Sequence, residues 1–131
     1  MDDSPQVEGV VYDTDLSVID RDQLEMLLMA DEGEDAHALV TEIFEIFKAE
    51  GREKLQNLEV VCQTKSLAEL RTMLHFVAGS AGNLGLLRLH GFFRGIELAI
   101  ESGRFDPPEN CASIIRAEFD AACVAFGQEL L

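Results

Sequence analysis

Apolar residues recur at steps of three and four along most of this chain, which is the pattern of amphipathic helices. Such stripes predict helices over about 35 to 62, 87 to 102 and 107 to 129, and a shorter helix that begins after Asp20. No segment alternates apolar and polar residues over the length of a strand, so we predict no β-sheet. The clearest stripe is formed by Leu67, Leu70, Leu74, Val77, Ala81 and Leu84.

Capping and breaking residues predict where these helices begin and end. Gly85 and Gly103 tolerate positive φ and are therefore expected just beyond helix ends. Gly51 falls within the apolar face of the long helix, where it allows either close packing or a slight bend. The predicted capping boxes are Asp20 with Gln23, Ser66 with Glu69, and Asp106 with Glu109, the last with Pro107 at the first helical position.

Four amphipathic helices joined by short connections favour an antiparallel, up-down-up-down four-helix bundle. We therefore predict an all-α fold of this kind, with a short additional N-terminal helix and a loop at Asp31 to Asp35. Residues 1 to 13 are polar and lack periodicity, so we expect a flexible arm there. Residues 14 to 131 are expected to form a single domain.

Composition and charge narrow the range of partners. The 131 residues carry a formal net charge of −15, which argues against nucleic acid and against anionic membrane surfaces as partners. The chain contains no apolar run long enough to span a membrane, and its acidic N-terminus does not resemble a signal peptide. Three cysteines without metal-type spacing are expected to be buried apolar residues. We expect a cytoplasmic monomer.

His75 is the most informative polar residue in the helix over 67 to 84. Its helical phase directs it away from the centre of the apolar stripe, towards solvent. Its neighbours on that face are Arg71, Ala78, Gly79 and Gly82, three of which have little or no side chain. Glycine within a helix costs about 0.5–1 kcal/mol relative to alanine. Two glycines so close to an exposed imidazole indicate that something large approaches the ring.

This segment resembles the motif of the histidine-containing phosphotransfer (HPt) family, which reads approximately His-x-Leu-Lys-Gly-Ser-x-x-x-Leu-Gly. Val77 conservatively replaces the first leucine, whereas Ala78 stands where the family usually has lysine. Flanking segments also resemble the family, so the likeness covers most of the chain. The residues that match the motif in register are His75, Gly79, Ser80, Leu84 and Gly85.

The resemblance implies a helical bundle in which His75 carries a phosphoryl group between aspartates. A neutral imidazole keeps an unprotonated ring nitrogen that can attack an aspartyl phosphate near neutral pH. This chain has no glycine-rich nucleotide loop and no Walker lysine, so we expect neither ATP binding nor autophosphorylation. The resemblance implies response-regulator receiver domains as partners, which would supply the aspartate, Mg²⁺ and a lysine. A hybrid histidine kinase is a second class of partner, and we expect no metal or cofactor in this chain itself.

Because position 78 is alanine, this chain lacks the lysine that the resemblance would place one turn from His75. Arg71, one turn before His75, is the best local substitute, because arginine binds phosphate well. Ser80 and Asn83 are candidates for orienting the ring or the phosphate, although polar residues on a helix surface are often only solvated. Replacing Arg71 with alanine is expected to slow transfer.

Other readings of His75 differ in what they require. A Ser-His hydrolase is not supported, because no orienting acid is evident in the sequence near Ser80 and His75. A docking module that binds and sequesters a receiver or a kinase needs no phosphotransfer. An interaction bundle without any signalling role needs neither phosphotransfer nor binding to a receiver or a kinase. Formation of phosphohistidine separates the transfer reading from the other two.

Overall fold

A computed structural model describes residues 4–29 and 35–131, and all regular secondary structure in these ranges is helical. The all-α class predicted from periodicity is therefore confirmed. The loop expected at Asp31 to Asp35 lies, apart from Asp35, outside the described residues. The helices are α1 (Arg21–Met29), α2 (Asp35–Lys54), α3 (Leu58–Gln63), α4 (Leu67–Asn83), α5 (Leu87–Glu101) and α6 (Cys111–Glu129).

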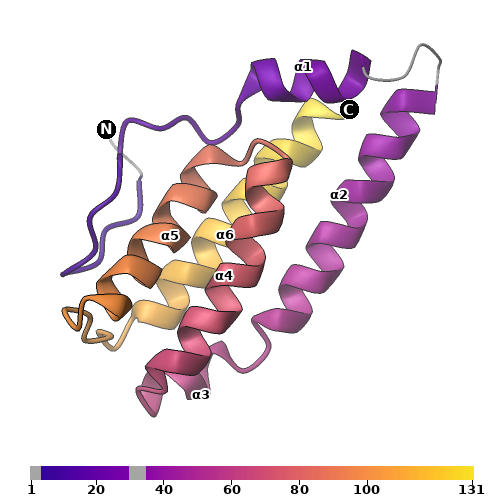
Figure 1. Ribbon diagram of the computed structural model, residues 1–131. Helices are drawn as coiled ribbons and strands as arrows, with labels where there is room; N and C mark the ends of the chain where they lie inside the picture. The colour runs from indigo at the N-terminus through magenta and orange to yellow at the C-terminus, as the bar shows by residue number, and fades with distance from the viewer. Residues whose placement is uncertain (1–3, 30–34) are drawn as a thin grey trace.

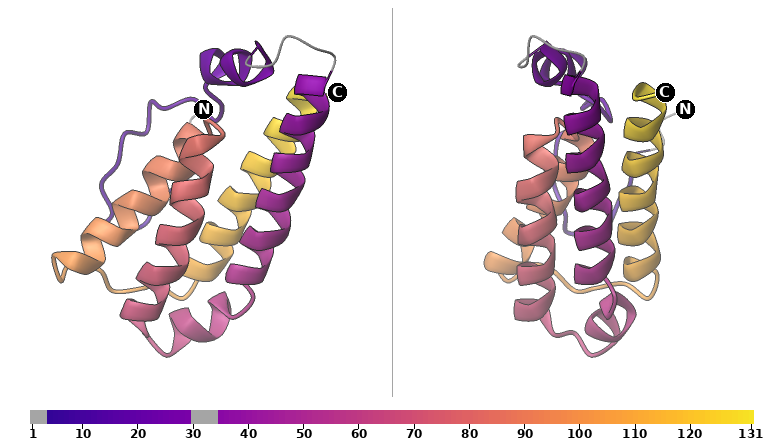
Figure 2. Two further views of the ribbon diagram at one scale, coloured as in Figure 1. Left: turned by 45° about the vertical axis from the view of Figure 1, so that its right-hand side comes forward. Right: turned by 90° about the vertical axis from the view of Figure 1, so that its right-hand side faces the viewer.

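The four long helices α2, α4, α5 and α6 lie alongside one another, and consecutive ones run in opposite directions (Figure 1). The short helix α1 crosses one end of this bundle, and α3 lies at the other end, between α2 and α4 (Figure 2). Among the described residues, no helix is both long enough and apolar enough to cross a membrane.

The core is filled by large side chains from the inward faces of the long helices. Phe44 of α2 packs against Phe126 of α6 with ring centroids 4.7 Å apart, and Phe47 packs against Phe119 at 5.6 Å. Gly51 allows this close approach, because a Cβ atom there would lie 2.5 Å from the Phe119 ring. Of the two roles weighed for Gly51, close packing is therefore the one that the structure supports.

The three cysteines are buried, as predicted, and all three are free thiols. Burial raises the pKa of Cys123 to about 11, so this thiol stays protonated at neutral pH.

The start of α1 follows the predicted cap in part. The Asp20 carboxylate accepts a hydrogen bond from the Gln23 backbone N–H at 3.1 Å, so Asp20 caps the helix. The Gln23 side chain does not return this bond but donates to the Asn83 carbonyl at 3.3 Å. The Asp20 backbone N–H in turn donates to the Gly85 carbonyl at 2.8 Å, and Gly85 has the expected positive φ of 76°. These contacts attach α1 to the end of α4.

The single long helix predicted over 35 to 62 is wrong, because residues 55–57 form a turn that separates α2 from α3. Asn57 stands at this break with φ −98° and ψ 20°. Leu55 and Leu58 on either side are fully buried, so the turn keeps both apolar side chains in the core. Burial at the end of the bundle outweighs the local preference for a continuous helix.

Two other predicted caps are corrected. Ser66 directly precedes α4, but its hydroxyl contacts the Thr64 hydroxyl at 2.9 Å and makes no capping bond. The last helix begins at Cys111 rather than at Pro107. Consecutive prolines explain this delay, because a residue that precedes proline is disfavoured in the helical region. Asp106 forms an ion pair with Lys65 at 2.7 Å instead of capping a helix.

The described part of the N-terminal segment contains no helix before α1 but packs along α5. Val7 is buried, and Tyr12 packs against Phe92 with ring centroids 5.3 Å apart. Gly91 and Gly95 leave room for this segment, since a Cβ atom on either would lie about 3 Å or less from it. The segment thus covers one face of α5, and a division of the chain at residue 13 remains a prediction.

Candidate functional site

His75 lies in the middle of α4 and points into solvent, with 72% of its side chain exposed. The residues before and after it on the apolar stripe, Leu74 and Val77, are almost completely buried. The predicted phase of α4 is therefore confirmed. Because the stripe holds the helix against the core, the imidazole is presented to solvent from a rigid element.

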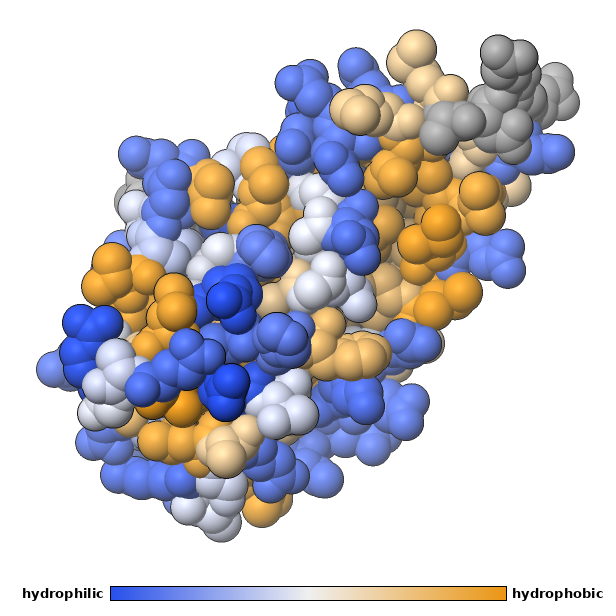
Figure 3. All heavy atoms as spheres, in the orientation of Figure 1, coloured by the Kyte–Doolittle hydropathy of each residue, from blue (hydrophilic) through white to orange (hydrophobic). Residues whose placement is uncertain are grey.

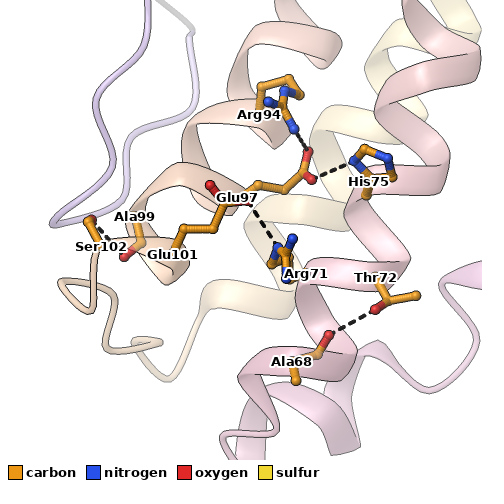
Figure 4. Close-up of polar contacts among 9 residues, drawn as sticks. All are labelled: Ala68, Arg71, Thr72, His75, Arg94, Glu97, Ala99, Glu101 and Ser102. Carbon is orange, nitrogen blue, oxygen red and sulfur yellow. Dashed lines mark hydrogen bonds and ion pairs between the residues drawn. The ribbon is translucent and has the colours of Figure 1, made fainter.

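Glu97 of α5 holds the His75 ring from the neighbouring helix (Figure 4). Its Oε1 atom lies 2.8 Å from His75 Nδ1, and its side chain is only 1% exposed. An ionised carboxylate only accepts hydrogen bonds, so Nδ1 carries the proton and its N–H group donates the hydrogen bond to Glu97. The other ring nitrogen, Nε2, then keeps its lone pair. The exposed imidazole is thus fixed in one tautomer.

The expectation that His75 lacks an orienting acid is wrong, because Glu97 has this role from 22 residues further along the chain. The sequence does contain a signal for it. Glu97 falls between Phe93 and Ile100 at helical steps of four and three, so it is a charged residue on the apolar face of its helix. A charge at such a position requires a partner, and the partners are His75 and Arg94.

Arg94 provides the positive charge closest to Glu97. Its Nη1 atom lies 3.0 Å from Glu97 Oε2, and 39% of its side chain is exposed. This contact is a charge pair rather than an aligned hydrogen bond, since Oε2 accepts no hydrogen bond within the described ranges. One buried carboxylate therefore contacts an imidazole with one oxygen and a guanidinium with the other. Sequence reasoning did not identify Arg94.

Arg71 lies one turn before His75, as expected, but its side chain is directed to a different carboxylate. Its Nε atom donates to Glu101 at 3.1 Å, and both side chains are about half exposed. Figure 4 shows this pair one turn along the helices from the pair of His75 and Glu97. The structure therefore brings Arg71 close to the site without a contact to the imidazole.

The two glycines beside His75 have different surroundings. A Cβ atom on Gly79 would meet nothing within 4 Å, so this part of the surface is open. A Cβ atom on Gly82 would lie 3.1 Å from the ring of His90, which packs across it from α5. Clearance for a partner thus remains the prediction for Gly79, whereas the room at Gly82 is filled by His90 of the same chain.

A comparison with models of known families matches residues 42–125 of this chain to the Hpt domain. This match spans more than half of the chain and includes both His75 and Glu97. The chain belongs to the HPt family. The resemblance read from the motif is therefore confirmed, and membership of this family implies histidine phosphotransfer in phosphorelays. No curated protein and no solved structure matched the chain in the corresponding comparisons.

The most distinctive departure of this HPt domain is Ala78. We placed Ala78 on the exposed face with His75, but the residue is fully buried. Its backbone carbonyl accepts a hydrogen bond from His90 Nδ1 at 2.8 Å, and the His90 ring closes the groove between α4 and α5 at this level. Position 78 is thus buried where α4 packs against α5, and it contributes no charge to the site.

Ser80 and Asn83 of this HPt domain lie on the side of α4 that faces α2. Together with Ile43 and Ile46 they line a shallow hollow between the two helices. Neither side chain hydrogen-bonds His75 within the described part of the chain, so the structure does not bring these two candidates to the imidazole. In the same ranges, no three His, Cys, Asp or Glu side chains gather into a group that could hold a metal ion.

Proposed function

We propose that this protein is a phosphorelay intermediate that accepts a phosphoryl group on His75 from a receiver-domain aspartate and donates it to a second receiver. One observation carries this proposal: an exposed imidazole donates from Nδ1 to a buried carboxylate 2.8 Å away. This contact leaves Nε2 as the nucleophilic nitrogen.

The chemistry follows from this arrangement. Nε2 attacks the phosphorus of the aspartyl phosphate, a P–N bond forms, the P–O bond to the aspartate breaks, and the aspartate leaves as a carboxylate. Both ring nitrogens of His75 are then substituted, so the ring carries a positive charge. Glu97 stabilises this charge through the hydrogen bond from Nδ1, as a carboxylate does for the imidazolium of a catalytic triad. Donation to a second aspartate reverses the same steps.

The partner contributes the other half of the reaction site. Phosphoryl transfer depends mainly on in-line positioning and charge stabilisation, and we propose that a receiver domain supplies the aspartate, Mg²⁺ and a lysine. The open surface at Gly79 gives a loop of that domain room to approach the imidazole. Hybrid histidine kinases that carry a receiver domain are a second class of partner.

An apolar row on α2 is the surface on which we place this docking. Leu39, Ile43 and Ile46 follow one another at steps of four and three and are 41% to 51% exposed. Figure 3 shows apolar side chains gathered over α2 in the same view that faces α4. Phe76, next to His75, is 38% exposed and extends this apolar surface towards the site. A central apolar patch with a polar rim is typical of protein interfaces.

The alternative is a docking module that binds a receiver without accepting phosphate. The observation that favours it is the absence of a lysine at position 78, where Ala78 is buried. The two functions differ in a single measurable product, which is phosphohistidine.

We would incubate the protein with phosphorylated receiver domains and Mg²⁺ and follow the acid-labile gain of one phosphoryl group by intact mass. His75→Ala is the variant that must lose the label. His90→Ala is the matched control, because His90 also lies between α4 and α5 but hydrogen-bonds a backbone carbonyl. Label on the wild type and on His90→Ala, with none on His75→Ala, is the expected result. Binding without label across a broad panel of receivers would contradict transfer and support the docking module.

Cytoplasmic location and a monomeric state belong to this proposal as predictions. Light scattering on the same preparations tests the monomeric state, because it gives the mass of the unphosphorylated protein in solution. A dimer at micromolar concentration would contradict the expected monomer.

A further inference from the structure

Side chains of α4 and α5 meet along one polar seam that runs through the site. From one end, Arg71 contacts Glu101 at 3.1 Å and His75 contacts Glu97 at 2.8 Å. At the other end His90 lies beside Gly82. Because the two helices are antiparallel, Arg94 of α5 is level with the turn of α4 that follows His75. On α4 itself, that turn presents no charged side chain.

A phosphoryl group on His75 needs a cation nearby for two reasons. It adds close to two negative charges next to Glu97, which is already ionised and buried. It also stands in the field of a protein whose formal net charge is −15. Both effects raise the free energy of the phosphorylated state unless a guanidinium or ammonium group lies within hydrogen-bonding reach of the phosphoryl oxygens.

Arg94 and Arg71 are the two arginines of this seam near His75, and their contacts distinguish them. Arg71 is directed to Glu101, which makes no contact with the imidazole. Arg94 contacts the same carboxylate as His75, so its guanidinium and the imidazole lie on either side of one group (Figure 4). A guanidinium has five N–H donors, and the contact with Glu97 is not even an aligned hydrogen bond. Arg94 therefore has donors to offer to a phosphate without leaving Glu97.

We infer that Arg94 binds the phosphoryl group carried by His75, so that α5 supplies the cation that α4 lacks at position 78. This inference rests on the proposed function, since it concerns the phosphorylated state of the same site. In the unphosphorylated protein Arg94 balances the charge of Glu97. After transfer it bridges Glu97 and the phosphoryl oxygens, and the phosphoryl dianion is favoured over the monoanion.

Two measurements test this inference on wild type, Arg94→Ala, Arg94→Lys and Arg71→Ala. The first is the rate of phosphoryl gain from a phosphorylated receiver. The second uses protein phosphorylated chemically with phosphoramidate, so it needs no receiver, and follows the ³¹P chemical shift of phosphohistidine 75 against pH. The signal is assigned by its absence in His75→Ala. Arg104→Ala is the control for loss of an arginine, because Arg104 contacts Ser102, outside the seam.

The expected result is that Arg94→Ala slows phosphoryl gain about tenfold or more and moves the ³¹P titration to higher pH. The direction follows because loss of a cation disfavours the dianion. Arg94→Lys is expected to restore most of both properties, whereas Arg104→Ala stays close to wild type. For Arg71→Ala the sequence alone predicts slower transfer. Because Arg71 is directed to Glu101, we expect its loss to slow phosphoryl gain less than Arg94→Ala does and to leave the ³¹P titration in place.

Three results would overturn the inference. The first is an Arg94→Ala protein with the wild-type rate and the wild-type titration. The second is a slower rate with an unchanged ³¹P titration, which would show that Arg94 acts only through Glu97. The third is a titration that shifts in Arg71→Ala instead. Failure of the proposed function has a different signature, because the wild type would then take no label from receivers although phosphoramidate still labels it.

Discussion

Helix α5 carries one buried charge pair and one half-buried charge cluster, and the contrast between them distinguishes a structural contact from the one that we propose to be functional. Towards α6, Arg88 Nε donates to Glu118 at 2.9 Å, and the two side chains are 7% and 3% exposed. Towards α4, Glu97 is just as buried, but its partners His75 and Arg94 are 72% and 39% exposed. Both side chains of the first pair, which we call the sealed pair, are buried. The second presents its partners to solvent, where another molecule can reach them.

The cost in folding free energy of removing one residue therefore differs between the buried pair and the half-buried cluster. Removing one partner of a buried pair takes away a charge that stabilises the other inside the protein, which costs folding free energy. Removing Glu97 leaves an arginine and a histidine that are already in contact with water. The α6 pair should therefore govern folding stability, and the α4 cluster should govern transfer.

The largest expected effect comes from breaking the sealed pair. Glu118→Ala should lower the free energy of unfolding by about 3–5 kcal/mol, because it removes a buried carboxylate that Arg88 Nε contacts at 2.9 Å. Chemical denaturation measures this change. Replacing both residues by apolar ones, Arg88→Met with Glu118→Leu, is the control and should be neutral or stabilising. A loss below about 1 kcal/mol in Glu118→Ala would mean that the pair is not sealed as described.

The second effect comes from breaking the open cluster. Glu97→Leu should slow phosphoryl transfer about 10–100-fold, because the Nδ1 proton loses its acceptor and the ring loses its fixed tautomer. Glu97→Gln keeps an acceptor oxygen and should lose less. Transfer reactions that are quenched at successive times and analysed by intact mass spectrometry give the rates. Equal rates in wild type and Glu97→Leu would remove Glu97 from the mechanism.

Two glycines show the same contrast between a buried and an open position, because Gly51 lies against the core and Gly79 lies at the open surface beside His75. Gly51→Ala should destabilise the fold by about 1–3 kcal/mol, because the added methyl group would overlap the Phe119 ring. Gly79→Ala should stabilise it by about 0.5–1 kcal/mol through helix propensity, since nothing lies within 4 Å. Thermal unfolding measures both. The account also predicts that Gly79→Ala weakens receiver binding, and unchanged affinity would show that no partner approaches position 79 closely.

The smallest effect is expected at an exposed pair. The backbone N–H of Glu59, followed by the Arg116 guanidinium, lowers the pKa of the Glu59 carboxyl below its ordinary value of 4.5. Its stabilisation is therefore present above pH 4.5 and is lost as the pH falls through the lower value of the folded state. Glu59→Gln should change stability at pH 7 only slightly, and the difference from wild type should vanish in acid. A large loss at pH 7 would contradict the rule that exposed ion pairs contribute little.

Local patterns predicted most of the fold and the exposed position of His75. Periodicity located the long helices because each buries one continuous apolar face, and the phase of His75 followed from the stripe beside it. The turn at residues 55–57 could not be predicted in this way, because it depends on how the end of the bundle packs around Leu55 and Leu58. The delayed start of α6 was predictable from its two prolines, whose effect on the preceding residue outweighs a favourable N-cap.

The rest of the site depends on contacts between helices. Glu97 was detectable in principle, as a charge on an apolar face, but its partner lies 22 residues away and is fixed only when α4 and α5 pack together. The burial of Ala78 and the filling of the space at Gly82 both depend on His90, whose position across the seam no spacing in the sequence reveals. Arg94 became recognisable only through its contact with the buried oxygen of Glu97.

The most direct test of the account is NMR spectroscopy of the phosphorylated protein with ¹⁵N-labelled histidine. The account predicts that the phosphoryl group couples to Nε2 of His75 while Nδ1 of the same ring keeps its proton, and that His37 and His90 stay unmodified. A phosphoryl group on Nδ1 of His75, or on either of the other histidines, would contradict the claim that Glu97 presents Nε2 as the nucleophile.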